Sequence, residues 1–156
     1  MDKEDIRDFV NDFNENLKGA LDVRFEPVDW VYSQSSGRLY LADSEDVRAL
    51  VASGYSGAVG YQNSAEHEHL VAKGPIPRGV WRIGVGFTHR RLGRVSIPLE
   101  AADPSKIHGR SGFYIHGDNA AANGSASSGC IVLPYDVRCW IAAGRTAGIR
   151  TLVVVI

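Results

Sequence analysis

A histidine and a cysteine fourteen positions apart have the types and the surroundings needed for nucleophilic catalysis. His116 closes the apolar run 113–115, and Cys130 follows the small residues 127–129. A free thiol has a pKa of about 8.5, so little of it is thiolate at neutral pH. An imidazole within hydrogen-bond reach can take the proton and hold a thiolate–imidazolium pair, which contributes on the order of 10²–10⁴ in rate. The pattern therefore predicts Cys130 as a nucleophile and His116 as its general base.

Acyl chemistry also needs hydrogen-bond donors that face the tetrahedral oxyanion. The backbone N–H groups of Ser128, Gly129 and Cys130 are the candidates, because small residues let the backbone approach a substrate closely. Loss of one such donor typically costs roughly 10²–10³ in rate. The segment 128–130 is thus predicted to form an oxyanion site.

The chain between the two residues can bring them together. The loop from His116 to Ser127 consists mostly of Gly, Ala, Asn and Ser, so it can fold back at a modest entropic cost. A carbonyl or side chain of Gly117, Asp118 or Asn119 could then orient the second ring nitrogen of the histidine. This would complete a triad-like arrangement.

The residues alone leave a structural alternative open, because a lone cysteine often packs in a core and a lone histidine is often a satisfied polar residue. Cys139 is interpreted in this way, as a small buried hydrophobe beside Trp140 and Ile141. A disulfide between Cys130 and Cys139 has little support, because a helix starting near Pro134 would hold the two sulfurs apart.

Other polar groups have both a surface and a functional interpretation. His67 and His69 form an H-x-H pair, but two ligands do not make a metal site and a third would have to come from elsewhere. We expect a solvated loop there, with no metal and no cofactor. Arg110 and Asp118 flank the strand of His116 and could bind charged ends of a substrate. The basic cluster of Arg90, Arg91 and Arg94 is interpreted as a solvated turn that could also meet acidic groups.

Hydrophobic periodicity predicts the elements that position these residues. An amphipathic helix is expected over 3–17, a β-hairpin over 30–34 and 38–41, and a short helix from Ser44 to a stop at Gly54. Further strands are expected over 80–84, 94–99, 112–116 and 151–156, and a second helix from Pro134 to about residue 143. The sum is a mostly β fold with two or three peripheral helices.

Composition narrows the class of protein. The chain has 156 residues, 44% of them hydrophobic, and 17 glycines, which fits one turn-rich domain. A formal net charge of −1 gives no basic footprint for nucleic acid. No apolar run reaches about 18 residues, so no membrane span is predicted. The acidic start 1–5 lacks the basic and apolar regions of a signal peptide, so export by another route is expected.

Five blocks of sequence carry a family resemblance. They are YSQSSGRL at 32–39, GYSG at 54–57, GPIPRG at 74–79, FYIHGDN at 113–119 and ASSGCIVL at 126–133. Together, in this order, they resemble the L,D-transpeptidase-like toxins delivered by type VI secretion systems. The similarity runs from about Trp30 to the last residue. It implies an N-terminal helical extension over 1–25 and an L,D-transpeptidase-like β-sandwich or barrel catalytic domain over 26–156.

The resemblance implies an activity on bacterial peptidoglycan. In this family the cysteine attacks the carbonyl of the third stem residue, meso-diaminopimelate, and expels the terminal D-alanine. Attack by water then gives L,D-carboxypeptidase action, and attack by a D-amino acid or another stem gives exchange or cross-linking. Peptidoglycan tetrapeptide stems are therefore the expected substrate.

Residue roles follow by position. Cys130 would be the nucleophile and His116 the base, with the Gly117 carbonyl steadying the imidazole and Ser128 and Gly129 contributing the oxyanion backbone. The candidate substrate-binding residues are Arg110, Asp118 and Ser127. Two residues depart from housekeeping L,D-transpeptidases: Ser128 replaces a second histidine, and Val132 replaces Asn or Arg. A shift from cross-linking toward hydrolysis is expected from these departures.

The resemblance also implies partners and a place of action. A toxin of this kind is made in the cytoplasm, carried by a type VI secretion component, active in the periplasm of target bacteria and neutralised by an immunity protein. Two alternatives stay open. One is a housekeeping or prophage wall-remodelling enzyme, and the other is a catalytically inactive peptidoglycan-binding module.

Overall fold

The computed structural model of the protein describes residues 29–156. The helix predicted over 3–17 and the extension over 1–25 lie outside the described residues. The strands are β1 (Asp29–Ser33), β2 (Arg38–Ala42), β3 (Arg48–Ser53), β4 (Tyr55–Ser56), β5 (Gly79–Ile83), β6 (Phe87–His89), β7 (Gly93–Ala101), β8 (Tyr114–His116), β9 (Ile131–Val132) and β10 (Thr151–Val155). The helical elements are α2 (Tyr135–Thr146) and two 3₁₀ turns, η1 (Ala65–His67) and η2 (Pro104–Lys106).

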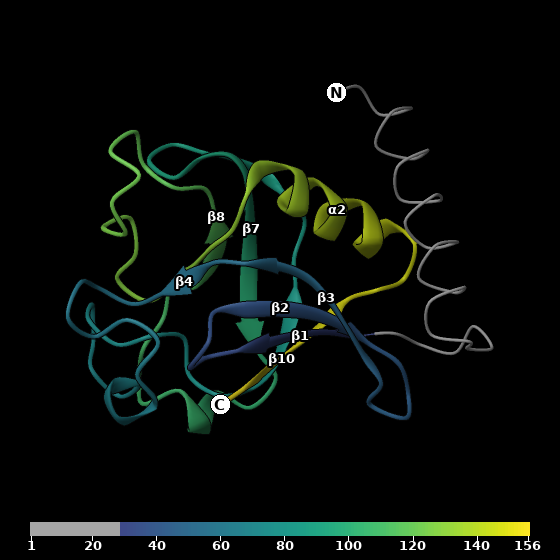
Figure 1. The fold of residues 1–156 in the computed structure, drawn as a ribbon, viewed down its shortest axis with the longest axis horizontal. Coiled ribbons are helices and arrows are strands. Elements are labelled where there is room, and N and C mark those ends of the chain that lie inside the picture. The colour runs from purple at the N-terminus through teal and green to yellow at the C-terminus, as the bar shows by residue number, and fades with distance from the viewer. Residues whose placement is uncertain (1–28) are drawn as a thin grey trace.

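One curved sheet dominates the fold. Its strand order is β3-β2-β1-β10-β5-β7-β8-β9-β4, and β6 pairs with β7 outside this path. The two end strands, β3 and β4, are separated in the chain only by Gly54, so the sheet curls until its edges meet. Figure 1 shows β1, β2 and β3 crossing in front of β7. The mostly β, sandwich or barrel architecture predicted from the sequence is confirmed.

Most predicted elements are present where the periodicity placed them. β1 and β2 pair as the expected antiparallel hairpin. The β-branched C-terminal run forms β10, which lies between β1 and β5 at the centre of the sheet. The predicted helix after Pro134 is α2, which lies alongside β7 and continues two residues past Gly144 (Figure 1).

The short helix predicted from Ser44 to Gly54 is wrong. That stretch contains a tight turn followed by β3, which pairs antiparallel with β2. The Asp43 carboxylate accepts hydrogen bonds from the backbone N–H groups of Glu45 and Val47, at 2.9 Å each, and so stabilises the turn. The apolar residues 47, 50 and 51 have helical spacing, but pairing with β2 outweighs this local preference. Consequently α2 is the one α-helix of residues 29–156.

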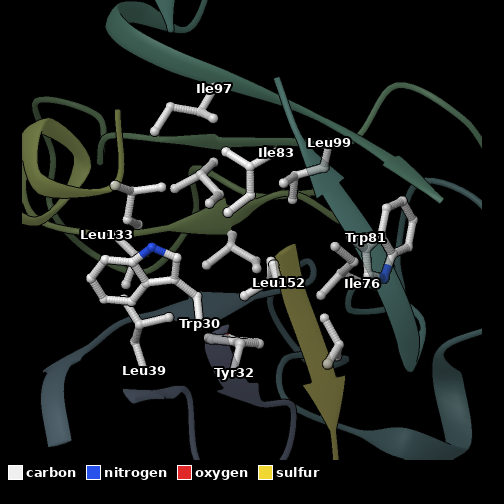
Figure 2. Packing of buried hydrophobic residues seen from close by; sticks show 14 of the residues in the cluster. Trp30, Tyr32, Leu39, Ile76, Trp81, Ile83, Ile97, Leu99, Leu133 and Leu152 are labelled. Atoms are coloured by element: carbon white, nitrogen blue, oxygen red, sulfur yellow. The ribbon is translucent and has the colours of Figure 1, made fainter. Parts of the chain in front are cut away.

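The core lies between the layers of the curled sheet. Trp30, Leu39 and Leu152 are almost fully buried, and Figure 2 shows their side chains facing Ile83 and Ile97. Burial of large aliphatic and aromatic side chains stabilises a fold by roughly 1.5–3 kcal/mol each. This packing fixes β8, which ends at His116, and β9, which begins directly after Cys130. No helix within residues 29–156 has the length and apolar character needed to cross a bilayer.

Candidate active site

The register of β8 and β9 brings His116 and Cys130 to the same face of the sheet. The two strands are parallel, with Ile115 opposite Ile131 and His116 opposite Val132. Ile115 and Ile131 both point into the core and are fully buried. Since successive side chains alternate between faces, His116 and Cys130 both lie on the opposite face, diagonally adjacent across the strand pair. The loop between them therefore folds back as predicted.

His116 is held by its neighbour in the chain. Its Nδ1 lies 2.7 Å from the carbonyl oxygen of Gly117. A carbonyl can only accept, so Nδ1 carries the proton and Nε2 is the free, basic nitrogen of the neutral ring. The Arg138 guanidinium packs against Gly117, where a Cβ would lie only 2.5 Å from Nη2. The side chain of His116 is 3% exposed.

The Cys130 thiol lies at the other end of β8. Its Sγ donates to the Gly112 carbonyl at 3.6 Å, and the backbone N–H of Tyr114 bonds to the sulfur. Burial raises the pKa of the thiol, against the lowering effects of the Tyr114 N–H and of the Arg110 charge. Burial also lowers the pKa of His116, and the Arg138 charge adds to this. Both shifts favour a neutral thiol and a neutral imidazole over the ion pair expected from the sequence.

The loop that carries Cys130 is organised around a buried serine. Ser127 Oγ accepts from the N–H groups of Gly57 (3.0 Å) and Gly129 (3.1 Å) and donates to the Cys130 carbonyl (2.6 Å). Its side chain is buried, whereas the adjacent Ser128 is exposed. Ser127 therefore shapes the loop from inside, and the N–H of Gly129 is already engaged.

The peptide bond between Gly129 and Cys130 has a fixed orientation. The carbonyl of Gly129 accepts from the buried Ser56 hydroxyl at 2.9 Å. Because the carbonyl and N–H of a trans peptide point in opposite directions, the Cys130 N–H is turned away from Ser56. Gly129 has φ +149° and lies against the Arg110 guanidinium, so a side chain there would clash.

Arg110 lies behind the loop. It is 6% exposed, and its guanidinium donates to the carbonyls of Pro75 (2.8 Å), Gly74 (2.9 Å) and Ser128 (3.4 Å), and to that of Glu68. These contacts join the 68–75 loop to the segment that carries the cysteine. In this arrangement Arg110 supports the loop from within, so the substrate contact predicted for it stays a prediction.

Asp118 lies at the exposed C-terminal end of β8. Its Oδ1 accepts from the Tyr55 hydroxyl at 2.7 Å and from the Asn119 N–H at 2.9 Å. It also lines a pocket of about 410 Å³, together with Gly117, Arg94, Tyr135 and Arg138. Among the predicted substrate-binding residues, Asp118 is a lining residue of this pocket.

The H-x-H segment does not gather metal ligands. His67 Nδ1 lies 2.8 Å from Ser64 Oγ, and Glu68 between the two histidines is bound to Arg78 and Gln34. Within the part of the chain that the structure describes, no group of three His, Cys, Asp or Glu side chains could hold a metal ion. Burial would raise the pKa of Glu68, but the hydrogen bonds from Arg78 and Gln34 lower it to about 2.

Sequence reasoning missed Arg138 and Tyr55. Arg138 is 7% exposed and donates to the carbonyls of Leu133 (3.1 Å) and Arg94 (2.6 Å), so it ties α2 to the strands beside His116. The sequence does contain a signal for Arg138, because it is a charged residue on the apolar face of α2, next to Val137. The contact between Tyr55 and Asp118 joins β4 to the end of β8 and has no signal in the local sequence.

One family model and several solved structures are similar to this chain. Residues 51–155 match the family model described as the Tlde1 domain. No curated protein matches the chain. Among solved structures, the chain is similar to L,D-transpeptidase 1 of Mycobacterium tuberculosis, with 17% identity and a TM-score of 0.46, covering 83% of this chain and 61% of that chain.

Two further solved structures are similar at the same level. One is an L,D-transpeptidase from Mycobacterium smegmatis, with 12% identity and a TM-score of 0.49, covering 83% of this chain and 58% of that one. The other is an L,D-transpeptidase from Xylanimonas cellulosilytica, with 12% identity and a TM-score of 0.49, covering 85% and 62%. The chain thus spans about three fifths of the length of these solved chains.

Proposed function

Because the chain belongs to the Tlde1 domain family, which is the family of type VI L,D-transpeptidase-like effectors that its sequence blocks resemble, we propose that it is a cysteine-dependent peptidoglycan enzyme. Its reaction is the removal of D-alanine from tetrapeptide stems, as an L,D-carboxypeptidase, or its replacement by another amine, as an L,D-transpeptidase. One observation carries this proposal: the β8–β9 register holds His116 and Cys130 on one face, with Nε2 of His116 left free to accept a proton.

The first half-reaction breaks the peptide bond between the third stem residue and the terminal D-alanine. The Cys130 thiol turns from the Gly112 carbonyl toward His116 by rotation about its Cα–Cβ bond, and Nε2 takes its proton. The sulfur then attacks the carbonyl carbon of the third stem residue, the C–N bond breaks, and the proton on Nε2 passes to the departing amine. The product is a thioester on Cys130 and free D-alanine.

The second half-reaction releases the stem. Water, or the amine of a D-amino acid or of another stem, attacks the thioester carbon and loses a proton to Nε2. The C–S bond then breaks, and the proton returns to the sulfur. Water gives a shortened tripeptide stem, whereas an amine gives an exchanged or cross-linked one. Both half-reactions need the same His116 nitrogen.

The backbone N–H of Cys130 is the donor best oriented for the oxyanion. The Gly129 carbonyl is held toward Ser56, so this N–H points to the other side of the peptide plane. The Gly129 N–H donates to Ser127 in the structure, so the oxyanion role expected of Gly129 would require that hydrogen bond to break. The N–H of the exposed Ser128 is the second candidate donor.

The experiment that tests the activity is mass spectrometry of tetrapeptide muropeptides incubated with the purified protein and with Cys130→Ala. Release of D-alanine by wild type alone supports the enzyme. Retained binding to sacculi without release by either protein would instead support an inactive wall-binding module. Adding a second D-amino acid separates exchange from hydrolysis, because only exchange incorporates it into the stem.

The effector role is a second part of the proposal. We place the site of action in the periplasm of target bacteria, with a type VI secretion component as carrier and an immunity protein as antagonist. Expression in a Gram-negative host, with and without a fused export signal, tests the compartment. Toxicity is expected only for the exported wild type and not for exported Cys130→Ala. Equal toxicity of the unexported protein would contradict a periplasmic target.

A further inference from the structure

A pocket of about 410 Å³ lies at the C-terminal end of β8, directly beside the histidine that acts as base. Gly117, whose carbonyl holds His116, is one of its lining residues. The other walls come from Leu92 in the β6–β7 turn, from Arg94 at the start of β7, and from Tyr135 and Arg138 in the first turn of α2. From the sequence alone Arg94 is expected in a solvated turn, and neither half-reaction of the proposed function uses the pocket.

Positive charge dominates the lining. The guanidinium carbons of Arg94 and Arg138 lie 5.8 Å and 5.5 Å from the centroid of the Tyr135 ring, so both cations gather around one aromatic side chain. Asp118 supplies a single carboxylate on the remaining side. Two guanidinium groups facing one carboxylate form a site suited to a small anion, above all a carboxylate.

The two arginines differ in how firmly they are held. Arg138 is buried, and its Nε and Nη1 donate to three backbone carbonyls, while its Nη2 is turned to Gly117 at the edge of the pocket. Arg94 is exposed, and its long side chain can move to meet a ligand. The arrangement is a fixed cation beside the base with a second, adjustable cation opposite to it.

The order of groups along β8 indicates which part of the substrate lies near this pocket. Cys130 Sγ contacts Gly112, His116 follows four residues later, and the pocket begins at Gly117. The departing amine must lie within hydrogen-bond distance of His116 Nε2 in order to receive its proton. In a terminal amino acid the carboxylate is one carbon beyond that amine. A carboxylate that extends from this amine along β8, away from the sulfur, would enter the pocket that begins at Gly117.

We propose that Arg94 and Arg138 bind the terminal carboxylate of the D-alanine that is expelled, and of the D-amino acid that replaces it in exchange. This inference rests on the proposed function, because it assigns a subsite to the leaving group of that reaction. Asp118 complements the ammonium group of the free amino acid, so the pocket matches a zwitterion in both charges. By microscopic reversibility the leaving and incoming amino acids use the same subsite.

The test compares two substrates that differ only at the terminal carboxylate. The first is the free tetrapeptide, and the second is the same peptide ending in D-alaninamide; kcat/KM for release of the fourth residue is measured for each. A charge-assisted hydrogen bond to a carboxylate gives a preference for the free acid of about 10- to 100-fold in wild type. Arg94→Ala is expected to lower this ratio several-fold, because Arg138 alone then holds the carboxylate, and Arg94→Lys is expected to restore part of it.

Arg91→Ala is the matched control, because it removes the same charge from an exposed position on the same turn without touching the pocket. A wild-type ratio that survives in Arg94→Ala would overturn the inference, as would an equal loss of the ratio in Arg91→Ala. Wild-type cleavage of both substrates at the same rate also contradicts it while leaving the proposed function standing. Failure of wild type to cleave either substrate overturns the proposed function and this inference with it.

Discussion

The Nδ1–H of His116 donates to the carbonyl of Gly117 at 2.7 Å, which leaves Nε2 as the nitrogen that can accept a proton. The residue that fixes the tautomer is thus the next one in the chain, and no acidic side chain is needed for it. Arg138 packs against the same glycine, so the carbonyl cannot easily turn away. The imidazole of His116, the proposed base, is thus oriented by the backbone, and a buried guanidinium holds that backbone in place.

Replacement of His116 by glutamine should abolish most of the turnover. The amide fills a similar volume but cannot carry the proton from thiol to amine, so we expect kcat to fall by at least about 100-fold. Circular dichroism and the melting temperature, measured beside D-alanine release, report whether the variant is folded. A folded variant that keeps more than about a tenth of the wild-type rate contradicts the role of His116 as base.

The protonation state of Cys130 predicts how the free enzyme reacts with alkylating agents. Burial raises the thiol pKa and lowers that of His116, so the neutral pair prevails at pH 7. The rate of alkylation by iodoacetamide should therefore be low at pH 7 and rise only as the pH passes the ordinary thiol range. A plateau of fast alkylation below pH 7 would reveal a preformed thiolate and contradict this assignment.

The pH profile of turnover gives an independent check of the same shifts. The base must be neutral, and the pKa of His116 lies below its ordinary value of 6.5. The acidic limb of kcat/KM should therefore fall below pH 6.5, and activity should persist in mildly acidic solution. An acidic limb above that value would indicate that the imidazolium is stabilised, as in an ion pair with the cysteine.

The adjacent serines 127 and 128 form a matched pair for mutation. Ser127→Ala removes a buried hydroxyl that makes three backbone contacts, so it should lower the free energy of unfolding by roughly 2 kcal/mol and reduce activity. Ser128→Ala alters an exposed side chain and should stay within about 0.5 kcal/mol of wild type. Denaturant titration of both measures the difference. Equal effects of the two substitutions would show that Ser127 does not organise the loop.

Glu68 should make the free energy of unfolding depend on pH in the acidic range. Its pKa falls from 4.5 in the unfolded chain to about 2 in the folded one, so its contribution is present above pH 4.5 and is lost as the pH drops toward 2. Glu68→Gln removes the ion pair with Arg78, and roughly 2 kcal/mol of stability at pH 7 should go with it. Urea unfolding at pH 7 and pH 3 tests this. The variant should lose less stability than wild type between the two values, and an equal loss argues against the assignment.

Local patterns were sufficient for most of the fold, and they also singled out the two residues that we propose as the catalytic pair. The alternation in 30–34 and the β-branched run 151–156 are strand signals that tertiary pairing reinforces. His116 and Cys130 stood out because their neighbours are unusual for structural residues. The sequence could not establish that the two residues lie on one face of the sheet. That placement depends on the parallel register of β8 and β9, and neither segment contains a signal for this non-local pairing.

What the sequence left undetermined depends on contacts between distant residues. The segment 48–53 has the spacing of a helix, and only its partner strand β2 decides otherwise. The carbonyls that Arg110 contacts belong to residues 68–75 and to Ser128, and no local pattern shows that the fold brings these segments together around it. The hydrogen bond from the Gly129 N–H likewise depends on the rotamer of Ser127, which no sequence pattern reveals.

The central claim is that Cys130 carries the acyl group, and intact-protein mass spectrometry tests it most directly. After rapid mixing with tetrapeptide, wild type should gain the mass of the stem less D-alanine, and peptide mapping should locate that mass on Cys130. Cys139→Ser should show the same adduct, because that buried thiol plays no part, while Cys130→Ala should show none. An adduct on Cys139, or D-alanine release by Cys130→Ala at the wild-type rate, would contradict the account.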